Sequence, residues 1–317
     1  MLAEPEEHAE PEKVVGTDPS PERAEPSPPS ATPLADPLLL AWRTTSVDGH
    51  RVRYAVVGQG PRAIFLHGWG LRPNSYREAI RAMADAGCRV YAPSLPGFGG
   101  TTELDAKDRS FAGYGRWVGR FLDAVGEEKV ALVAGHSFGG GVATAFTHAQ
   151  PDRVASLLLA NAVGSPTWAL FPNEVRTMVQ RPFWDWTRHF TGDLLSTPRR
   201  FRLLPTLLED FAMNLLVNPL GMIRAGEFIR RADLVEEVRS IADSGIPVSV
   251  SWSDRDGLVP RSAFDDLRRA AGVEGVVIEG PHAWPIADPA AFRELVISAL
   301  VDARGRDTTA RARVNPA

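Results

Sequence analysis

Cysteine is almost absent from this chain of 317 residues, because Cys88 is the only one. A single cysteine excludes an internal disulfide and any cysteine-rich metal site. Cys88 begins an apolar stretch, GCRVYAPS, and free cysteine behaves in proteins as a small hydrophobic residue. We therefore expect Cys88 to be a buried structural thiol.

An excess of one charge and long hydrophobic runs are missing as well. The formal net charge is −4, and lysine occurs only at positions 13, 107 and 129, so no basic field is present to attract nucleic acid. No apolar run is long enough to span a bilayer, and the first residues lack the basic and apolar regions of a secretory signal. We expect a cytoplasmic protein with no nucleic-acid partner and no membrane span. The composition favours no particular oligomeric state.

The bulk composition is that of a globular protein, with 44% hydrophobic and 23% charged residues. Residues 1–36 differ, because proline, glutamate, serine and alanine dominate there and large apolar side chains are scarce. Such a composition cannot offset the entropy lost on ordering, so we predict a disordered acidic tail. Residues 304–317 predict a second, flexible and basic tail.

Strand patterns alternate with helix patterns over residues 37–163 and 244–303. The first two strands form a predicted antiparallel hairpin around Asp48 and Gly49. The repeated strand-helix units that follow are typical of an α/β fold, with a mostly parallel central sheet flanked by helices. Residues 164–243 interrupt the alternation with helical periodicity and aromatic side chains. They predict a helical cap inserted after the sixth strand.

Ser137 stands at a corner, in the stretch VALVAGHSFGGG. An apolar strand pattern precedes it and a helix pattern follows, while the glycines at 135, 139, 140 and 141 remove side chains that would clash in a sharp turn. The hydroxyl would then lie exposed above the sheet. To act as a nucleophile it needs a general base, a carboxylate that orients the base, and donors for the oxyanion.

Among the seven histidines, His282 is the best placed to be that base, because it directly follows the last predicted strand. Asp256 follows the strand before it, and the carboxyl ends of parallel strands assemble the sites of α/β sheets. Asp254 shares the strand parity of Asp256, so facing alone does not choose between the two carboxylates. We expect His189, in the insertion, to be a surface or core residue.

The chain resembles the α/β-hydrolase fold serine hydrolases, of the esterase and lipase type with a lid. FLHGWG is similar to the oxyanion loop of that family, GHSFGG to its nucleophile elbow, SDRDGLVP to its acid loop and GPHAWP to its histidine loop. APSLPGFGGT resembles the loop after the fourth strand, with Ser94 where the family often has aspartate. The resemblance covers residues 38–303.

The resemblance implies a role for each matched residue. Ser137 would be the nucleophile, His282 the base and Asp256 the orienting carboxylate, which in the family lies four residues before a proline, as Asp256 does here. The backbone amides of Trp69 and Phe138 would form the oxyanion hole. His67 would shape its loop, and Asp254 would bond loop amides.

The predicted function is hydrolysis of a carboxylic ester with an apolar portion, through an acyl-enzyme and without cofactor or metal. The partners are then a small acyl substrate and water, and we expect Trp168, Phe183 and Trp186 of the cap to contact the substrate. A thioesterase, an amidase and a carbon–carbon bond hydrolase stay open as alternatives. A ligand-binding protein without turnover is the alternative of another class. A serine nucleophile argues against the reactions of dehalogenases and epoxide hydrolases. Members of the family that catalyse those reactions have aspartate at this position.

Overall fold

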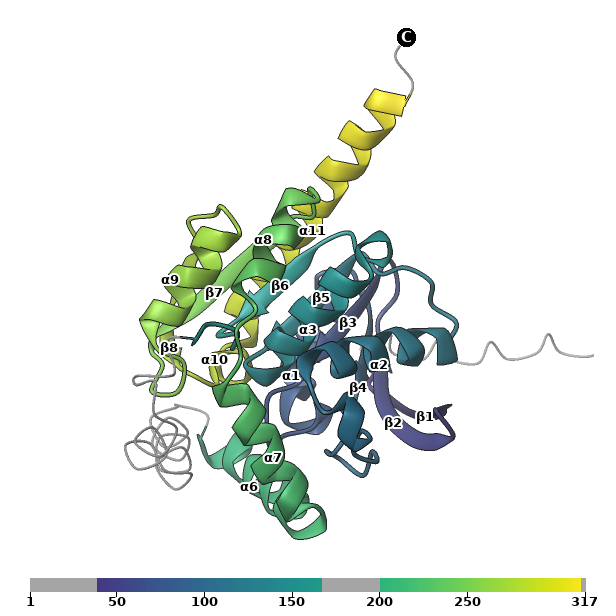
Figure 1. The fold of residues 1–317 in the computed structure, drawn as a ribbon, viewed down its shortest axis with the longest axis vertical. Helices are drawn as coiled ribbons and strands as arrows, with labels where there is room; N and C mark the ends of the chain where they lie inside the picture. Colours follow the sequence, from purple (N-terminus) through teal and green to yellow (C-terminus); the bar gives the residue numbers. More distant parts are fainter. Residues whose placement is uncertain (1–38, 167–199, 315–317) are drawn as a thin grey trace, which may run out of the picture. The chain divides into compact units, whose positions relative to one another are not determined.

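A computed structural model describes residues 39–166 and 200–314 of the chain, with side chains over 39–166 and 205–304. Eight strands form one sheet in the order β1-β2-β4-β3-β5-β6-β7-β8 (Figure 1). The strands are β1 (Ala41–Val47), β2 (His50–Val57), β3 (Arg62–Leu66), β4 (Arg89–Pro93), β5 (Leu132–His136), β6 (Leu157–Ala160), β7 (Val248–Arg255) and β8 (Val276–Pro281).

The sheet is mostly parallel, as the sequence predicts. β1 pairs antiparallel with β2 and β2 with β4, whereas β4, β3, β5, β6, β7 and β8 pair in parallel. The predicted hairpin is present, and Asp48 and Gly49 both have positive φ values of 53° and 79° at its turn. Aspartate and glycine are among the residues that tolerate such angles.

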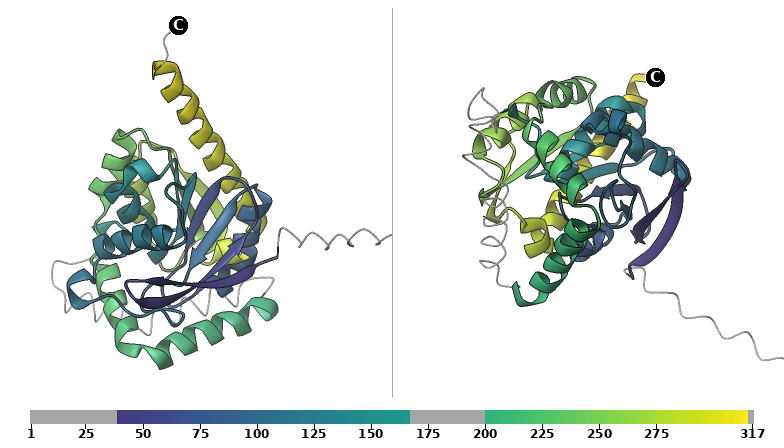
Figure 2. Two further views of the ribbon diagram at one scale, coloured as in Figure 1. Left: turned by 90° about the vertical axis from the view of Figure 1, so that its right-hand side faces the viewer. Right: turned by 60° about the horizontal axis from the view of Figure 1, so that its bottom comes forward.

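Helices cover both faces of the sheet (Figures 1 and 2). On one face lie α2 (Phe111–Ala124), α3 (Phe138–Ala149), α8 (Val235–Asp243) and α9 (Arg261–Ala270). On the other lie α1 (Arg77–Asp85), α10 (Trp284–Ala287) and α11 (Pro289–Val314). The connections within the described residues include the short 3-10 helices η1 (Pro73–Tyr76), η2 (Ala106–Asp108) and η3 (Pro151–Arg153).

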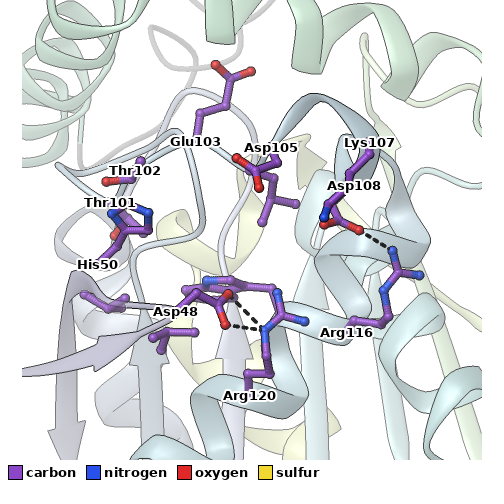
Figure 3. Close-up of a pocket in the computed structure, with 14 residues that line it drawn as sticks. Asp48, His50, Thr101, Thr102, Glu103, Asp105, Lys107, Asp108, Arg116 and Arg120 are labelled. Atoms are coloured by element: carbon purple, nitrogen blue, oxygen red, sulfur yellow. Dashed lines mark hydrogen bonds and ion pairs between the residues drawn. The ribbon is translucent and has the colours of Figure 1, made fainter.

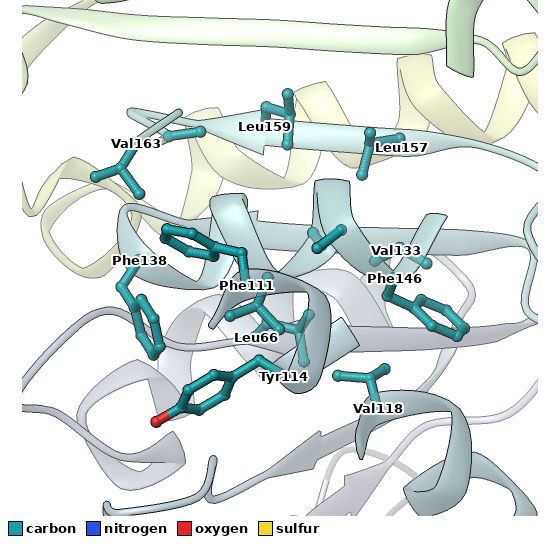
Figure 4. Close-up of a cluster of buried hydrophobic side chains, with 14 of the residues drawn as sticks. Leu66, Phe111, Tyr114, Val118, Val133, Phe138, Phe146, Leu157, Leu159 and Val163 are labelled. Carbon is teal, nitrogen blue, oxygen red and sulfur yellow. The ribbon is translucent and has the colours of Figure 1, made fainter. Parts of the chain in front are cut away.

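Two hydrophobic clusters lie between the sheet and the helices on its two faces. Successive residues of a strand belong to opposite clusters. In β6, Leu157 and Leu159 join the cluster beneath α2 and α3, which Figure 4 shows, whereas Leu158 and Ala160 join the cluster beneath α1 and α11. Successive strand side chains point to opposite faces, so a strand buried on both sides is apolar throughout. Cys88 is fully buried in the second cluster.

The segment between β6 and β7 holds α6 (Arg200–Val217) and α7 (Pro219–Arg230) before α8. We expected one helical cap over residues 164–243, but α8 packs against α3 and α9 with Val238 and Ile241 buried. It therefore belongs to the layer on the sheet, which helical periodicity alone cannot distinguish from a cap. Residues 167–199 and the predicted tail at 1–36 lie outside the described residues.

The last helix, α11, continues to Val314, into the stretch 304–317 for which the sequence predicts a flexible basic tail. Arginine and alanine, which dominate this stretch, are strong helix formers. The flexibility of the tail stays a prediction.

Candidate active site

Ser137 connects β5 to α3 in a backbone conformation that only glycine adopts easily. Its φ is 55° and its ψ is −120°. Neighbouring backbone holds this conformation, because the Ser137 amide donates to the carbonyl of Ala160 (3.0 Å) and its carbonyl accepts from the amides of Gly140 (2.9 Å) and Val163 (3.2 Å). Non-glycine residues at such angles carry strain that the surrounding structure must offset, and they cluster at functional sites.

The glycines after Ser137 allow α3 to start directly against the ends of two strands. A Cβ atom on Gly139 would lie 2.1 Å from the carbonyl oxygen of Leu66 in β3, and one on Gly140 would lie 2.4 Å from the Cβ of Ala162. Both distances are far below van der Waals contact. The glycines therefore fix the nucleophile elbow between β3 and β6.

Asp256 and His282 form a hydrogen-bonded pair at the carboxyl ends of β7 and β8. Asp256 Oδ2 lies 2.7 Å from His282 Nδ1, and both side chains are buried. Asp256 Oδ1 accepts from the amides of Leu258 (2.7 Å) and Val259 (2.8 Å). The bond places a proton on Nδ1 of a neutral imidazole, so Nε2 carries the lone pair that a general base needs.

Asp254 lies apart from this pair. Its Oδ1 accepts from the amide of Gly280 at 2.9 Å, and 46% of its side chain is exposed. The geometry therefore brings Asp256, and not Asp254, to His282.

A chain of hydrogen bonds joins three loops behind Ser137. The amide of Gly68 donates to Tyr76 Oη (3.2 Å), which donates to His136 Nδ1 (2.7 Å), and His136 Nε2 donates to the carbonyl of His282 (2.9 Å). Burial lowers the pKa of His136 well below its usual range. The neutral ring can both accept and donate, so it ties the histidine loop to the residue that precedes Ser137.

The oxyanion loop passes directly over the elbow. A Cβ atom on Gly68 would lie 3.5 Å from the Cβ of Ser137, so the amide of Trp69 belongs to the same corner. Phe138 is the first residue of α3, where backbone amides have no acceptor within the helix. The Trp69 ring turns toward α7, and its Nε1 donates to the carbonyl of Met222 at 3.0 Å.

His67 stabilises this loop through hydrogen bonds of both ring nitrogens. Its Nδ1 donates to the carbonyl of Gly68 (2.9 Å), and its Nε2 accepts from the amide of Leu95 (2.9 Å). Burial lowers the pKa of His67 to about 4, which keeps the ring neutral. Both ring nitrogens are used by backbone, so His67 shapes the loop. Ser94, beside Leu95, likewise accepts a bond from Thr101 Oγ1 through its carbonyl (2.9 Å).

Several predicted residues cannot be placed, and some supporting residues were not predicted. Trp168, Phe183, Trp186 and His189 lie outside the described residues. Asn161, which the sequence reasoning missed, donates from Nδ2 to Asp256 Oδ2 and accepts from Trp284 Nε1 (2.8 Å). Its signal in the sequence is a polar residue directly after the buried strand β6. Tyr76 was missed too, since no local pattern marks it.

A polar cavity of about 370 Å³ lies elsewhere, between the β1–β2 turn, residues 101–108 and α2 (Figure 3). Arg120 pairs there with Asp48 (2.9 Å) and Arg116 with Asp108 (2.5 Å). The paired charges leave no concentrated field of one sign, and none of the predicted catalytic residues lines this cavity.

Two further features, a metal-binding cluster and a membrane-spanning helix, are absent from the residues that the structure describes. Over 39–166 and 200–314, no group of three or more histidine, cysteine, aspartate or glutamate side chains is arranged to hold a metal ion. No helix within these same ranges has the length and apolar character that a membrane crossing requires.

Comparison with known proteins gives consistent matches over most of the chain. The family model of the alpha/beta hydrolase fold matches residues 61–288. A pimeloyl-(acyl-carrier protein) methyl ester esterase of Aeromonas hydrophila is 27% identical, covering 75% of this chain and 95% of that protein. A protein of Mycobacterium phage D29, provisionally named a non-heme haloperoxidase, is 26% identical, covering 80% of this chain and 93% of that protein.

Solved structures share the fold. A membrane phospholipase A, described as a bacterial virulence factor, matches with a TM-score of 0.68 and 22% identity, covering 84% of this chain and 87% of that one. The esterase RhEst1 of Rhodococcus sp. matches with a TM-score of 0.61 and 24% identity, covering 82% of this chain and 99% of that one.

Proposed function

This chain belongs to the α/β-hydrolase fold family and is a hydrolase of that fold, and we propose that it cleaves carboxylic esters through a Ser137 acyl-enzyme. The observation that carries the proposal is the buried bond between Asp256 and His282, on a loop that His136 ties to the nucleophile elbow. In such a triad the histidine is the general base that activates the serine hydroxyl, and the aspartate orients the histidine.

In the acylation step, Ser137 Oγ attacks the ester carbonyl carbon while His282 Nε2 takes the hydroxyl proton. The carbonyl oxygen becomes an oxyanion, which the amides of Trp69 and Phe138 stabilise. When the tetrahedral intermediate collapses, the bond to the alkoxy group breaks and the imidazolium returns its proton to the departing alcohol. Asp256 stays ionised throughout and stabilises the imidazolium.

In the deacylation step, water attacks the acyl carbon and His282 takes one of its protons. The second intermediate collapses with loss of Ser137 Oγ, which recovers the proton from His282. The carboxylic acid leaves and the free enzyme is restored. No electron transfer and no further reactant are needed.

Two observations favour an ester with an apolar portion. Curated relatives from Aeromonas and Vibrio are named as methyl ester esterases. The cap side of the oxyanion loop is apolar, because the Trp69 ring packs edge-on against Phe211 (5.8 Å between ring centres) and a Cβ atom on Gly70 would contact Phe211 and Met222.

A fluorophosphonate probe and a series of 4-nitrophenyl esters test the proposal. We expect the probe to label wild-type protein at Ser137 and not Ser137→Ala, and the same substitution to lower kcat by about 10⁴-fold or more. Ser137 is only partly buried, so we expect Ser137→Ala to fold, and its melting temperature is the control. Retention of a tenth of the wild-type activity would exclude Ser137 as the nucleophile.

The same experiments separate the alternatives. Activity on thioesters, amides or diketones in place of esters would keep the nucleophile but change the bond that is cleaved. Failure of the probe to label wild-type Ser137 would instead favour a ligand-binding protein on this fold.

A further inference from the structure

α6 buries two polar side chains on the face that also buries Leu207, while several of its apolar side chains are exposed. Its fully buried positions include Asp210 and Asn214, which are 0% and 4% exposed. Leu216 and Val217 near its end are 78% and 69% exposed. A helix that packed only for hydrophobic burial would have the reverse arrangement. The two buried polar side chains therefore need an explanation in what they contact.

Asn214 contacts the oxyanion loop with its whole amide. Its Nδ2 donates to the carbonyls of Gly70 (2.9 Å) and Leu71 (3.4 Å), and its Oδ1 accepts from the amide of Gly99 (2.8 Å). One side chain thus satisfies three backbone groups from the loops that follow β3 and β4. Burying an amide is costly unless it is bonded in this way.

The backbone that Asn214 contacts is a tight turn. The amide of Leu71 donates to the carbonyl of Gly68 (3.3 Å), and Gly70, the third residue of the turn, has a φ of 74°. That angle at the third position is characteristic of a type II turn, whose central peptide is flipped relative to type I. The Trp69 amide belongs to the same peptide as the Gly68 carbonyl, and that carbonyl accepts the bond that closes the turn. Holding the turn closed therefore fixes the direction in which the Trp69 amide points.

Asp210, one helical turn before Asn214, secures the chain just beyond the turn. Its carboxylate accepts from Arg72 Nε and Ser75 Oγ, and Arg72 also pairs with Glu209 (2.9 Å). Asp210 and Asn214 are four residues apart and so share one face of α6. This face is fastened to the oxyanion loop at two successive places.

We propose that Asn214 of α6 is a positioning residue that holds the Gly68–Leu71 turn in the conformation that directs the Trp69 amide at the oxyanion. The proposal rests on the proposed ester hydrolysis at Ser137. Asn214 touches no reacting atom and acts through the carbonyls of Gly70 and Leu71. The cap segment thereby takes part in transition-state stabilisation through α6.

The expected consequence is a loss of kcat with little change in KM. The oxyanion exists only in the transition state and intermediates, so a misdirected amide weakens those states and not the bound ester. Removing one oxyanion donor outright costs about 10²- to 10³-fold in kcat, and a donor misplaced by about 1 Å costs up to about 10²-fold. We expect Asn214→Leu and Asn214→Asp to lower kcat by about 10- to 100-fold.

The two variants act on different bonds. Asn214→Leu keeps a similar volume and removes all three hydrogen bonds. Asn214→Asp keeps the acceptor for Gly99 and sets an oxygen against the carbonyls of Gly70 and Leu71. Asn214→Asp has the smaller change in shape, so it tests the proposal even where Asn214→Leu does not fold. Thermal melting establishes that each variant is folded.

Asn218→Ala is the matched control. Asn218 lies four residues further on, where its Oδ1 caps α7 by accepting from the amide of Gly221 (3.0 Å), and it makes no bond to the Gly68–Leu71 turn. Loss of a helix cap destabilises the helix and the structure around it. A general loosening of the two helices would therefore lower kcat in Asn218→Ala too, whereas the proposal predicts a kcat within about twofold of wild type.

The readouts are kcat and KM on a 4-nitrophenyl ester and the inhibition constant of an alkyl boronic acid, which forms a tetrahedral adduct with the serine. We expect the inhibition constant to rise in the same proportion as kcat/KM falls across the Asn214 variants. Wild-type kcat in a folded Asn214→Asp protein, or equal losses in Asn218→Ala, would overturn the proposal. Absence of fluorophosphonate labelling in the wild type would instead refute the serine mechanism itself.

Discussion

At the scale of single residues, the acid of the proposed triad is defined by its hydrogen bonds. Asp256 accepts from His282, from Asn161 and from two backbone amides, and it is fully buried, whereas Asp254 bonds one loop amide and is half exposed. A carboxylate held by this many donors is fixed in direction. The two aspartates, two positions apart, therefore have separable functions.

Substitution of each aspartate by asparagine tests this separation. Asp256→Asn should lower kcat by about 10⁴-fold, because an amide in that place favours the wrong tautomer of His282. Asp254→Asn keeps an oxygen that can accept from the Gly280 amide and loses only the exposed charge pair with Arg255, so it should retain most of the activity. Both variants are measured on one activated ester. The reverse ranking would assign the triad acid to Asp254.

A second residue-scale prediction concerns pH and stability. Burial lowers the pKa of His67 from 6.5 to about 4, so between these values the unfolded chain binds a proton that the folded protein does not. Stability therefore rises with pH across this window. The contribution of His67 is complete above pH 6.5 and is lost as pH falls toward 4, by up to about 3 kcal/mol. The buried ring of His136, with a lowered pKa, acts in the same direction.

Denaturant unfolding between pH 4.5 and 7.5 measures this dependence. His67→Gln should show a shallower loss of unfolding free energy toward acid than wild type, with the remaining slope due to His136. His148→Gln, at an exposed position of α3, should keep the wild-type slope. An unchanged slope in His67→Gln would mean that the buried ring is not neutral in the folded protein.

At the scale of elements, the active corner depends on how closely α3 approaches β3 and β6. The approach is possible only because Gly139 and Gly140 have no side chains. It also sets the place of the Phe138 amide, the first of α3, relative to Ser137. Packing of two elements thus determines the position of a proposed oxyanion donor.

Alanine substitutions at two glycines test that dependence. Gly139→Ala places a methyl group 2.1 Å from the carbonyl oxygen of Leu66, which is backbone and cannot rotate away. We expect a loss of about 1–3 kcal/mol in unfolding free energy together with reduced kcat. Gly226→Ala in α7 is the control, because its nearest neighbour is 3.8 Å away and alanine favours a helix by about 1 kcal/mol. It should melt at or above the wild-type temperature, and equal losses in both would contradict the packing argument.

At the scale of the whole molecule, the sequence predicts that the first segment of the chain adds little to the fold. Among the residues that the structure describes, the sheet starts at Ala41, and the buried members of both hydrophobic clusters run from Val47 onward. The sequence of residues 1–36 offers few apolar side chains that could pack against either cluster.

Deletion of residues 1–36 should therefore leave the melting temperature and kcat/KM on a small ester unchanged. Calorimetry and ester hydrolysis on the shortened and full chains provide the measurement. A melting temperature lower by several degrees would show that the segment packs on the domain.

The sequence by itself determined the fold class and indicated the residues of the candidate site. The strand-helix alternation predicted the mostly parallel sheet, and the positions of Asp256 and His282 directly after later strands predicted that these two side chains lie at one edge, where they hydrogen-bond. The role of Ser137 beside them stays a prediction. These are local signals, because a buried strand is apolar throughout and a tight corner requires glycine. The positions at strand ends then carry over directly into space.

Only the tertiary structure identified the residues that hold the candidate site in place. Tyr76, Asn161 and Asn214 lie in three separate segments of the chain, and their hydrogen-bond partners are 8 to 144 positions away. A polar residue within a helix such as α6 has no local mark that distinguishes a buried amide from an exposed one. The boundary between cap and core was hidden for the same reason, since α8 has the periodicity of any amphipathic helix and its layer depends on what it packs against.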